Sequence, residues 1–460
     1  MRIDTRSGKA TLAREARLSL RAAKIGLGQS LEQRPRVASR LEGTRRACRT
    51  TRFRVRSVCA DLVSGDPYLD TARVFHVPVS ALVGRTQLPP WYRLSRHPGA
   101  VMGGDWDQAP YFFEESPYWV EFREALEGER PWAETESFRA RMEVAESETS
   151  AWRRRIMVAE ALRVHRRYED LYESMRTSGC LSQSELARRG GRGYEPASVD
   201  DISIGIGRTG QLLLCEGGHR VEVARALGCR TVPVWVALRH PEWWAFRQRV
   251  VAYAAGHRGG LPEQLLHPDI DTIPVSYDCR TRFDTVSAAL SSGRGPLLDV
   301  SPGWGYFLHR FEALGFDCTA VAPPRFAENR YFLNKLRAAS DRHFNVVDDV
   351  QSVVVPTEEP VAALLLLRDT DWWLSTATAR EALSTLLVSA RPRHVFVEDP
   401  TADRNGLVGS DPQSCSSEAV RFCAAAAGLQ HVEVLGVSGA NPLFHLSETP
   451  GTGKTPVQVG

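Results

Sequence analysis

Short apolar runs alternate with amphipathic stretches between residues 283 and 448, and this alternation constrains the possible folds more than any other feature. The apolar runs lie at residues 297–300, 318–321, 344–347, 363–367 and 395–398. Uninterrupted apolar strands separated by amphipathic helices are typical of a parallel sheet that helices cover on both faces. Two final runs, at 432–437 and 443–446, flank a Gly-Ala-Asn-Pro turn and predict an antiparallel hairpin. The sequence therefore predicts an α/β domain with a mostly parallel sheet and a terminal hairpin.

The first of these runs leads into Asp-Val-Ser-Pro-Gly-Trp-Gly at residues 299–305. Bare glycines let a ligand approach backbone amides, and an acid after the strand can orient a charged ammonium. This motif, with the parallel strands and the hairpin, resembles the Rossmann-like class I S-adenosylmethionine-dependent methyltransferases over about residues 283–448. The resemblance implies that S-adenosyl-L-methionine binds at Asp299, Ser301, Gly303 and Gly305, with Asp348 near its adenine amino group.

Several departures from that family's pattern concern the activity. Ser301 stands where the family usually has the first glycine, and Asp349 competes with Asp348 for the adenine. After the second strand the family has an acid that binds the ribose, whereas this chain has Ala322 followed by two prolines. Losing such an acceptor costs on the order of 1.5 to 3 kcal/mol, and Glu328 is an alternative ligand. No catalytic base or substrate motif follows residue 367, so a methyltransferase-like domain without activity remains an alternative.

A second glycine turn, Glu-Gly-Gly-His-Arg, occupies residues 216–220 in the N-terminal half. An apolar run precedes it and an amphipathic stretch that stops at Gly228 follows, which predicts a strand, a turn and a helix. The first turn of a helix offers free N–H groups and the positive end of the helix dipole. His219 and Arg220 therefore predict an anion site, and a plain turn with both side chains in water is the alternative.

This turn, its helix and the following Val-Pro-Val strand resemble the ParB/sulfiredoxin-like domain over about residues 160–250. Members of that superfamily include CTP-binding partition proteins, sulfiredoxin and a free-serine kinase, and their turn binds nucleotide phosphates. The resemblance implies that Gly217, Gly218, His219 and Arg220 bind the phosphates of a nucleotide such as ATP, ADP or CTP. Glu216 takes the position of the acid before the glycine and would be a catalytic base if the chemistry is phosphoryl transfer or hydrolysis.

The 460 residues suffice for several domains. We expect a basic, partly disordered arm at 1–56, an accessory region at 57–158, the ParB/sulfiredoxin-like α+β module at 159–258, a linker at 259–282, the methyltransferase-like domain at 283–448 and a flexible tail at 449–460. The arm contains sixteen Lys or Arg residues and only four acids, so it can dock on nucleic acid. Only Phe53 could stack on bases there, which favours a solvated tail instead.

Other features exclude some classes of protein. No run of about 18 apolar residues is present, which predicts no transmembrane helix, and the N-terminus lacks the apolar core of a secretory signal. The nine cysteines are scattered without a Cys-x-x-Cys pair, so neither a disulfide framework nor a zinc site is expected. These observations favour a reduced, cytoplasmic compartment. Asp105 and Asp107 lack further ligands nearby, so no metal site is expected.

The leading hypothesis is an S-adenosylmethionine-dependent methyltransferase with an attached nucleotide- or phosphate-binding module and an open choice of acceptor. One alternative is a nucleotide-dependent phosphotransferase or hydrolase whose methyltransferase-like domain is not catalytic. Another is a nucleotide-sensing DNA-binding protein that uses the basic arm. The oligomeric state is left open by the sequence.

Overall fold

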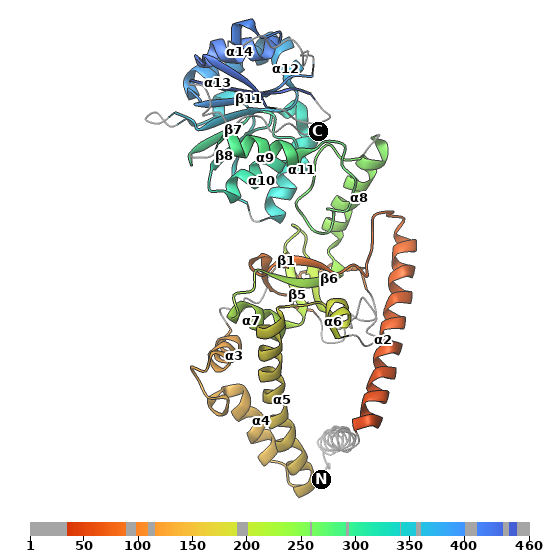
Figure 1. The fold of residues 1–460 in the computed structure, drawn as a ribbon. Helices are drawn as coiled ribbons and strands as arrows, with labels where there is room; N and C mark the ends of the chain where they lie inside the picture. Colours follow the sequence, from red (N-terminus) through yellow and green to blue (C-terminus); the bar gives the residue numbers. More distant parts are fainter. Residues whose placement is uncertain are drawn as a thin grey trace, which may run out of the picture. The chain divides into compact units, whose positions relative to one another are not determined.

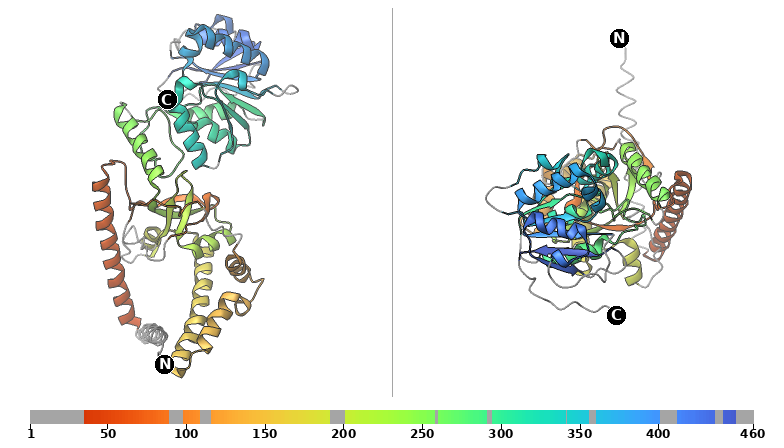
Figure 2. Two further views of the ribbon diagram at one scale, coloured as in Figure 1. Left: turned by 180° about the vertical axis from the view of Figure 1, so that it is seen from behind. Right: turned by 90° about the horizontal axis from the view of Figure 1, so that it is seen from above.

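The computed structural model describes residues 35–88, 98–108, 116–190, 201–257, 260–290, 294–340, 342–355, 360–400, 412–435 and 441–448. The chain divides into two compact units, Met1–Ala245 and Phe246–Gly460, and each has its own sheet (Figures 1 and 2). The division falls within helix α8 (Pro241–Gly256), so the segment 259–282 that we expected as a linker is part of the second unit.

The first unit contains one six-stranded sheet in the order β1-β6-β4-β5-β2, with β3 also paired to β6. Its strands are β1 (Phe75–Pro78), β2 (Leu82–Arg85), β3 (Ala100–Val101), β4 (Ile202–Ile206), β5 (Leu212–Glu216) and β6 (Thr231–Arg239). β4 and β5 are antiparallel, whereas β6 is parallel to β4 and β2 is parallel to β5. Three of the strands come from residues 75–101, upstream of the range expected for the module. The unit is therefore α+β, and its sheet combines strands from residues 75–101 with strands from residues 202–239.

The helices of the first unit are α2 (Pro35–Ser64), α3 (Pro117–Glu127), α4 (Glu136–Glu146), α5 (Ala151–Ser178), α6 (Gln183–Gly190) and α7 (Gly218–Ala226). Residues 136–178 form two helices, α4 and α5, and not one continuous helix. They separate because Ser150 caps α5, its hydroxyl accepting a hydrogen bond from the Arg153 N–H at 3.4 Å. α7 ends before Gly228, which has the positive φ of 62° expected of a glycine that follows a helix.

Part of the expected basic arm is helical, because α2 begins at Pro35; residues 1–34 lie outside the described residues. Phe53 on α2 is 2% exposed and packs edge-on against Trp235, with ring centroids 4.8 Å apart. The arm's one aromatic ring is therefore part of a hydrophobic core, so this part of the arm is not a solvated tail.

The second unit contains one seven-stranded sheet in the order β12-β13-β11-β10-β7-β8-β9. Its strands are β7 (Pro296–Asp299), β8 (Asp317–Val321), β9 (Asn345–Val347), β10 (Ala363–Leu366), β11 (His394–Glu398), β12 (His431–Leu435) and β13 (Leu443–Ser447). The five neighbouring strands β11, β10, β7, β8 and β9 are parallel, and β13 is antiparallel to both β11 and β12. The predicted parallel sheet with an antiparallel end is confirmed, although residues 436–440 of the expected hairpin turn lie outside the described residues.

Helices cover both faces of this sheet, as Figure 1 shows. They are α9 (Cys279–Ala289), α10 (Tyr306–Ala313), α11 (Ala327–Ala339), α12 (Thr370–Ser375), α13 (Ala377–Ala390) and α14 (Glu418–Ala427). One core packs α9 and α10 against the sheet, with Phe283 and Phe311 among its buried residues. The other packs α13 and α14, with Leu383 and Val420. Burying each such side chain contributes about 1.5 to 3 kcal/mol, so the two cores hold the helices against the sheet.

In the part of the chain that the structure describes, we find no helix with the length and apolar character needed to cross a membrane.

Candidate functional sites

The loop after β7 lies at the edge where the parallel strands have their carboxyl ends, the usual ligand edge of such sheets. Asp299 ends β7 and is 1% exposed, and its Oδ1 accepts a hydrogen bond from the Ser301 N–H at 3.0 Å. Burial, with a smaller contribution from the nearby Glu263, raises the pKa of Asp299 to about 7 despite that hydrogen bond. Asp299 is therefore close to half-ionised at neutral pH, and a cation beside it would favour the carboxylate.

Ser301 has a role that the family pattern did not suggest. Its hydroxyl accepts hydrogen bonds from the backbone N–H groups of Leu367 and Arg368, at 2.9 and 3.0 Å. The side chain therefore ties the loop after β7 to the end of β10. A glycine at position 301 would leave these two N–H groups without that acceptor. Serine in place of the family's glycine therefore has a structural role.

Glu263 is the residue of this site that the sequence did not reveal. It belongs to the segment between α8 and α9 and is 1% exposed. Its carboxylate accepts hydrogen bonds from the backbone N–H groups of Trp304 and Tyr306, the latter at 3.0 Å. It also pairs with the Arg368 guanidinium, with 3.3 Å between Nη1 and Oε1. The amides of the glycine loop thus already bind a carboxylate.

Different structural constraints require glycine at each of the two glycine positions of the loop. Gly303 and Gly305 have φ values of 55° and 100°, which other residues rarely adopt. A Cβ at position 303 would overlap the carboxylate of Glu263, and one at position 305 would lie 2.6 Å from the Leu333 Cδ1. Gly303 is therefore what allows Glu263 to reach the loop amides.

A second cluster of polar side chains surrounds Glu398, the last residue of β11. Tyr277 donates its hydroxyl proton to the Glu398 carboxylate, which also pairs with Arg282 at 3.0 Å and accepts a hydrogen bond from Asn441 at 2.9 Å. Burial, and then the charge of Glu398, raise the pKa of Tyr277 above its usual range. The Glu398 carboxylate is thus occupied by three partners, and the raised pKa keeps the Tyr277 hydroxyl protonated at neutral pH.

The remaining predicted cofactor residues follow neighbouring strands. Asp348 comes after β9 and pairs with Arg330 at 2.6 Å, whereas Asp349 accepts a hydrogen bond from the Ser352 N–H at 2.7 Å. That backbone hydrogen bond lowers the pKa of Asp349. Ala322 is buried after β8, and Glu328 pairs with Arg249 at 3.5 Å. Asp349 therefore caps a short helix and Asp348 pairs with an arginine, so each of the two candidates for the adenine already has a partner.

The turn at 216–220 forms the predicted junction of strand and helix in the first unit. Glu216 is the exposed last residue of β5, and Gly217, with a φ of 99°, precedes α7. A Cβ at Gly217 would lie 3.0 Å from the Ile202 side chain, and one at Gly218 would lie 2.8 Å from the Trp119 ring. Backbone conformation and packing therefore account for both glycines without a ligand.

His219 lies in an aromatic cluster formed with Tyr118, Trp119, Phe122 and Tyr168. Its Nε2 is 2.8 Å from the Tyr118 hydroxyl, and its ring stacks on Tyr168 with centroids 4.4 Å apart. Trp119 and Phe122 contact it at centroid distances of 5.2 and 5.1 Å. Burial is the main cause that lowers the pKa of His219 to about 4, so the imidazole is neutral at pH 7.

A phosphate at this turn would therefore depend on arginines for its positive partners. Arg220 is in the first turn of α7, with its Nη1 3.9 Å from the Asp201 carboxylate. Arg141 and Arg85 both act electrostatically on His219. These cations come from α7, α4 and β2, and the last two were not among the residues that the sequence singled out.

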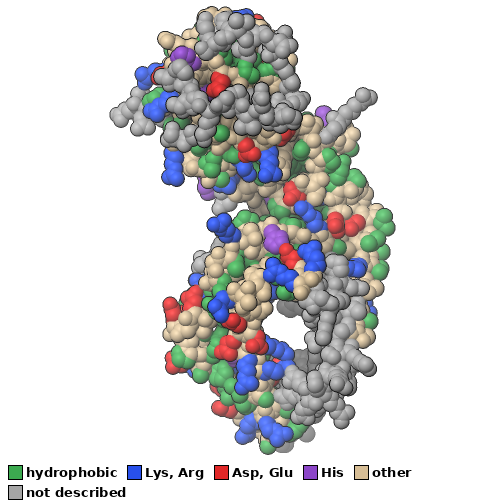
Figure 3. All heavy atoms as spheres, viewed as in Figure 1, with side chains coloured by type: hydrophobic (Ala, Val, Ile, Leu, Met, Phe, Trp, Pro, Cys, Tyr) green, Lys and Arg blue, Asp and Glu red, His purple; other side chains and the backbone are tan. Residues whose placement is uncertain are grey.

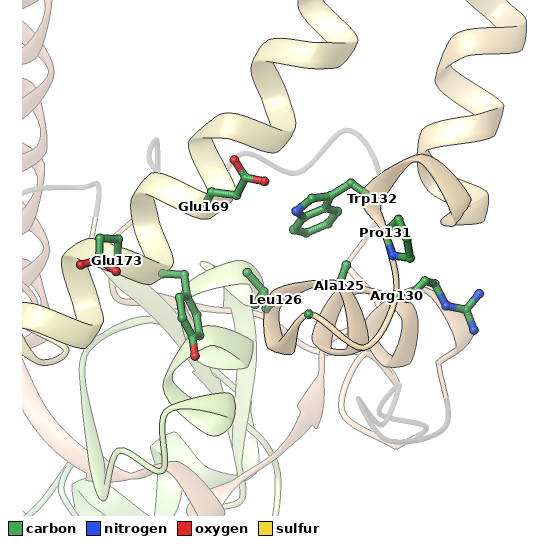
Figure 4. A pocket seen from close by; sticks show the side chains of 9 residues that line it. Ala125, Leu126, Arg130, Pro131, Trp132, Glu169 and Glu173 are labelled. Carbon is green, nitrogen blue, oxygen red and sulfur yellow. The ribbon is translucent and has the colours of Figure 1, made fainter.

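A cavity of about 470 Å³ lies between the end of α3 and α5 (Figure 4). Trp132 and Tyr172 contribute aromatic surface to its lining, and Glu169 and Glu173 contribute carboxylates. Arg130 also lines the cavity, but it already pairs with Glu121 and Glu124, so the two carboxylates disfavour a phosphate and the cavity does not extend the predicted nucleotide site.

Asp105 and Asp107 bind the same arginine. Arg208 contacts Asp105 at 3.0 Å, and it donates to Asp107 through both its guanidinium and its backbone N–H. Across the residues that the structure describes, no group of three or more His, Cys, Asp or Glu side chains could hold a metal ion. On the face drawn in Figure 3, acidic and basic side chains alternate over the described helices of the first unit instead of forming one basic surface.

No family model matches the sequence, and no curated protein matches it. Among solved structures, WbdD, described as a bifunctional kinase-methyltransferase, matches with 16% identity and a TM-score of 0.28. That match covers 41% of this chain and 46% of WbdD, so it spans less than half of WbdD. The methyltransferase domain of a bacterial CtHen1 protein matches with 16% identity and a TM-score of 0.26, over 36% of this chain and 98% of that domain. TM-scores this low carry no argument about function, which rests on the sheet and on the residues at its edge.

Proposed function

We propose that the second unit binds S-adenosyl-L-methionine and transfers its methyl group to an acceptor that is still to be identified. One observation carries the proposal: a buried acid, Asp299, precedes a glycine loop whose amides at Trp304 and Tyr306 already donate to a carboxylate. The amino-acid end of the cofactor offers an ammonium and a carboxylate. Asp299 suits the first, and the loop amides suit the second.

The remaining parts of the cofactor fit less completely. We expect Asp348 to bind the adenine amino group, but Ala322 offers the ribose no acceptor. The missing charge-assisted hydrogen bond is worth about 1.5 to 3 kcal/mol, so we expect an affinity roughly tenfold to a hundredfold below that of a site with the acid. When bound, the cofactor supplies an electrophilic methyl group. The chain's task is to hold the acceptor in line with it, which does not require a catalytic base.

Calorimetry on the full chain tests this proposal, with S-adenosylmethionine and S-adenosylhomocysteine titrated to millimolar concentration. We expect binding to the wild type and at least tenfold weaker binding to Asp299→Asn, because a neutral amide cannot pair with the ammonium. Asp317→Asn is the matched control, since Asp317 is an exposed aspartate at the opposite end of β8. If the wild type binds neither ligand at millimolar concentration, the proposal is wrong.

A second candidate function belongs to the first unit, where Arg220 lies in the first turn of α7 and Arg141 and Arg85 act electrostatically on the neighbouring His219. These positive charges support binding of a phosphate-bearing ligand such as ATP, ADP or CTP. Glu216 is exposed at the end of β5 and would be the base if the nucleotide is turned over. We expect Arg220→Gln to weaken nucleotide binding and Arg230→Gln, at an exposed loop arginine, to leave it unchanged.

Turnover separates a phosphotransferase or hydrolase from a simple nucleotide-binding module. If the full chain consumes nucleotide and Glu216→Gln abolishes this without changing the affinity, the first unit is an enzyme. Equal binding by the wild type and Arg220→Gln would show that the turn is not the phosphate site.

A further inference from the structure

Glu263 occupies the position in the glycine loop that a ligand carboxylate would need. We propose that Glu263 is a specificity-determining residue: its carboxylate competes with the amino-acid carboxylate of a ligand for the N–H groups of Trp304 and Tyr306. A ligand carboxylate then enters the loop only when Glu263 leaves it. This inference rests on the proposed S-adenosylmethionine site. It adds a rule about whether the loop accepts a ligand that carries a carboxylate.

The contacts of Glu263 make sharing unfavourable. Both of its oxygens are engaged, Oε1 by the Trp304 N–H and by Arg368, and Oε2 by the Tyr306 N–H. Each N–H group has one proton to donate, so a second carboxylate must replace the first. Asp299 already contributes another acid, and Arg368 is the cation that pairs with Glu263. A ligand carboxylate added beside both acids would meet like-charge repulsion in a buried site.

The backbone around Glu263 is held in place, which makes the competition persistent. The Leu261 N–H donates to the Pro274 carbonyl, and the Ser276 N–H donates to the Leu261 carbonyl, both at 2.8 Å. Leu261 and Leu265, on either side of Glu263 in the sequence, are fully or almost fully buried. Glu263 therefore leaves the loop by turning its side chain, and the segment stays where it is.

The rule distinguishes ligands that differ in one group. S-Adenosylhomocysteine and its decarboxylated analogue, S-adenosyl-3-thiopropylamine, share the adenosine, the sulfur and the ammonium, and only the first has a carboxylate. In the wild type, S-adenosylhomocysteine has to displace Glu263 before its carboxylate gains the loop amides. The analogue meets no such competition, and the acidic surroundings favour its ammonium.

Calorimetry on the full chain with these two ligands tests the inference. We expect the wild type to bind S-adenosylhomocysteine no more tightly than the analogue. Glu263→Gln removes the charge and one of the two acceptors, so S-adenosylhomocysteine should bind at least tenfold more tightly to it than to the wild type. The analogue should change by less than threefold. Glu381→Gln, at an exposed glutamate on α13, is the control and should alter neither affinity.

Each other outcome has a defined meaning. A wild type that binds S-adenosylhomocysteine more than threefold more tightly than the analogue overturns the inference, and this comparison needs no variant. Unchanged or weaker binding of S-adenosylhomocysteine by folded Glu263→Gln also overturns it, while the proposed cofactor site stands. If neither protein binds either ligand, both the cofactor site and this inference fail.

Discussion

The backbone N–H of Leu367 donates a hydrogen bond to the hydroxyl of Ser301 at 2.9 Å, which joins the end of β10 to the loop after β7. The two residues are separated by 66 positions in the sequence. The hydrogen bond lies at the edge of the sheet where Asp299 is buried. Position 301 therefore helps to fix the geometry of the candidate site, because its side-chain hydroxyl binds backbone N–H groups at the ligand edge.

Ser301→Ala should destabilise the second unit by about 2 to 3 kcal/mol, because it leaves the N–H groups of Leu367 and Arg368 without their acceptor. Urea unfolding measures the change. Ser375→Ala, at an exposed serine in α12, is the control and should stay within about 0.5 kcal/mol of the wild type. Equal stabilities of the two variants would mean that the serine hydroxyl has no structural role.

The pKa of about 7 at Asp299 predicts that cofactor binding is coupled to proton release. A bound ammonium favours the ionised carboxylate. The number of protons released per binding event should therefore rise as the pH falls below 7 and approach one near pH 6. The affinity should fall over the same range. Calorimetry in two buffers with different ionisation enthalpies measures the release, and Asp299→Asn should abolish it. Binding without proton release at pH 6 would contradict the assignment.

Asp107 and Asp105 form a matched pair around Arg208, because the Asp107 side chain is fully buried and that of Asp105 is 79% exposed. Asp107→Ala should lower the free energy of unfolding by about 2 to 4 kcal/mol, since it leaves the Arg208 guanidinium and N–H without their main acceptor. Asp105→Ala should cost less than about 1 kcal/mol, as is usual for exposed ion pairs. Denaturant unfolding of the two variants checks the difference, and similar losses would contradict it.

His219 predicts a specific loss of stability in mild acid. Its pKa falls from 6.5 to about 4 in the folded protein, so between these values the unfolded chain binds more protons than the folded chain. The contribution of neutral His219 is complete above pH 6.5 and is lost as the pH falls toward 4.

His219→Phe keeps an aromatic ring in the cluster and removes the titration. The stability of the wild type relative to this variant should therefore decrease by about 1 to 2 kcal/mol from pH 7 to pH 5. Urea unfolding at both pH values gives the relative stability, in which the other titrating groups cancel. A difference that does not depend on pH would show that His219 is not held in its neutral form.

The sequence predicted those parts of the second unit that depend on local pattern. Apolar runs gave the parallel strands, because a strand buried on both faces has to be apolar along its whole length. The acid and glycines at 299–305 marked the loop at the carboxyl edge, which the structure places as expected.

The rest depended on contacts between distant residues. Glu263 lies 41 residues before Trp304, and nothing in its local sequence distinguishes it from a surface glutamate. Ser301 looked like a lost glycine because its partners follow another strand. His219 looked like a phosphate ligand, but its burial among the rings of α3 and α5 is the main reason that it is neutral. Such properties arise from packing, which local patterns do not encode.

The position of β13 has a consequence for synthesis on the ribosome. This strand is the last along the described part of the chain, yet it pairs with β11 on one side and with β12 on the other. Until Leu443–Ser447 emerges, β12 has no partner in the sheet and β11 has an unpaired edge. A nascent chain paused before this point exposes that edge to other strands. The sheet that carries the candidate site can therefore be completed only when these last strand residues have left the exit tunnel.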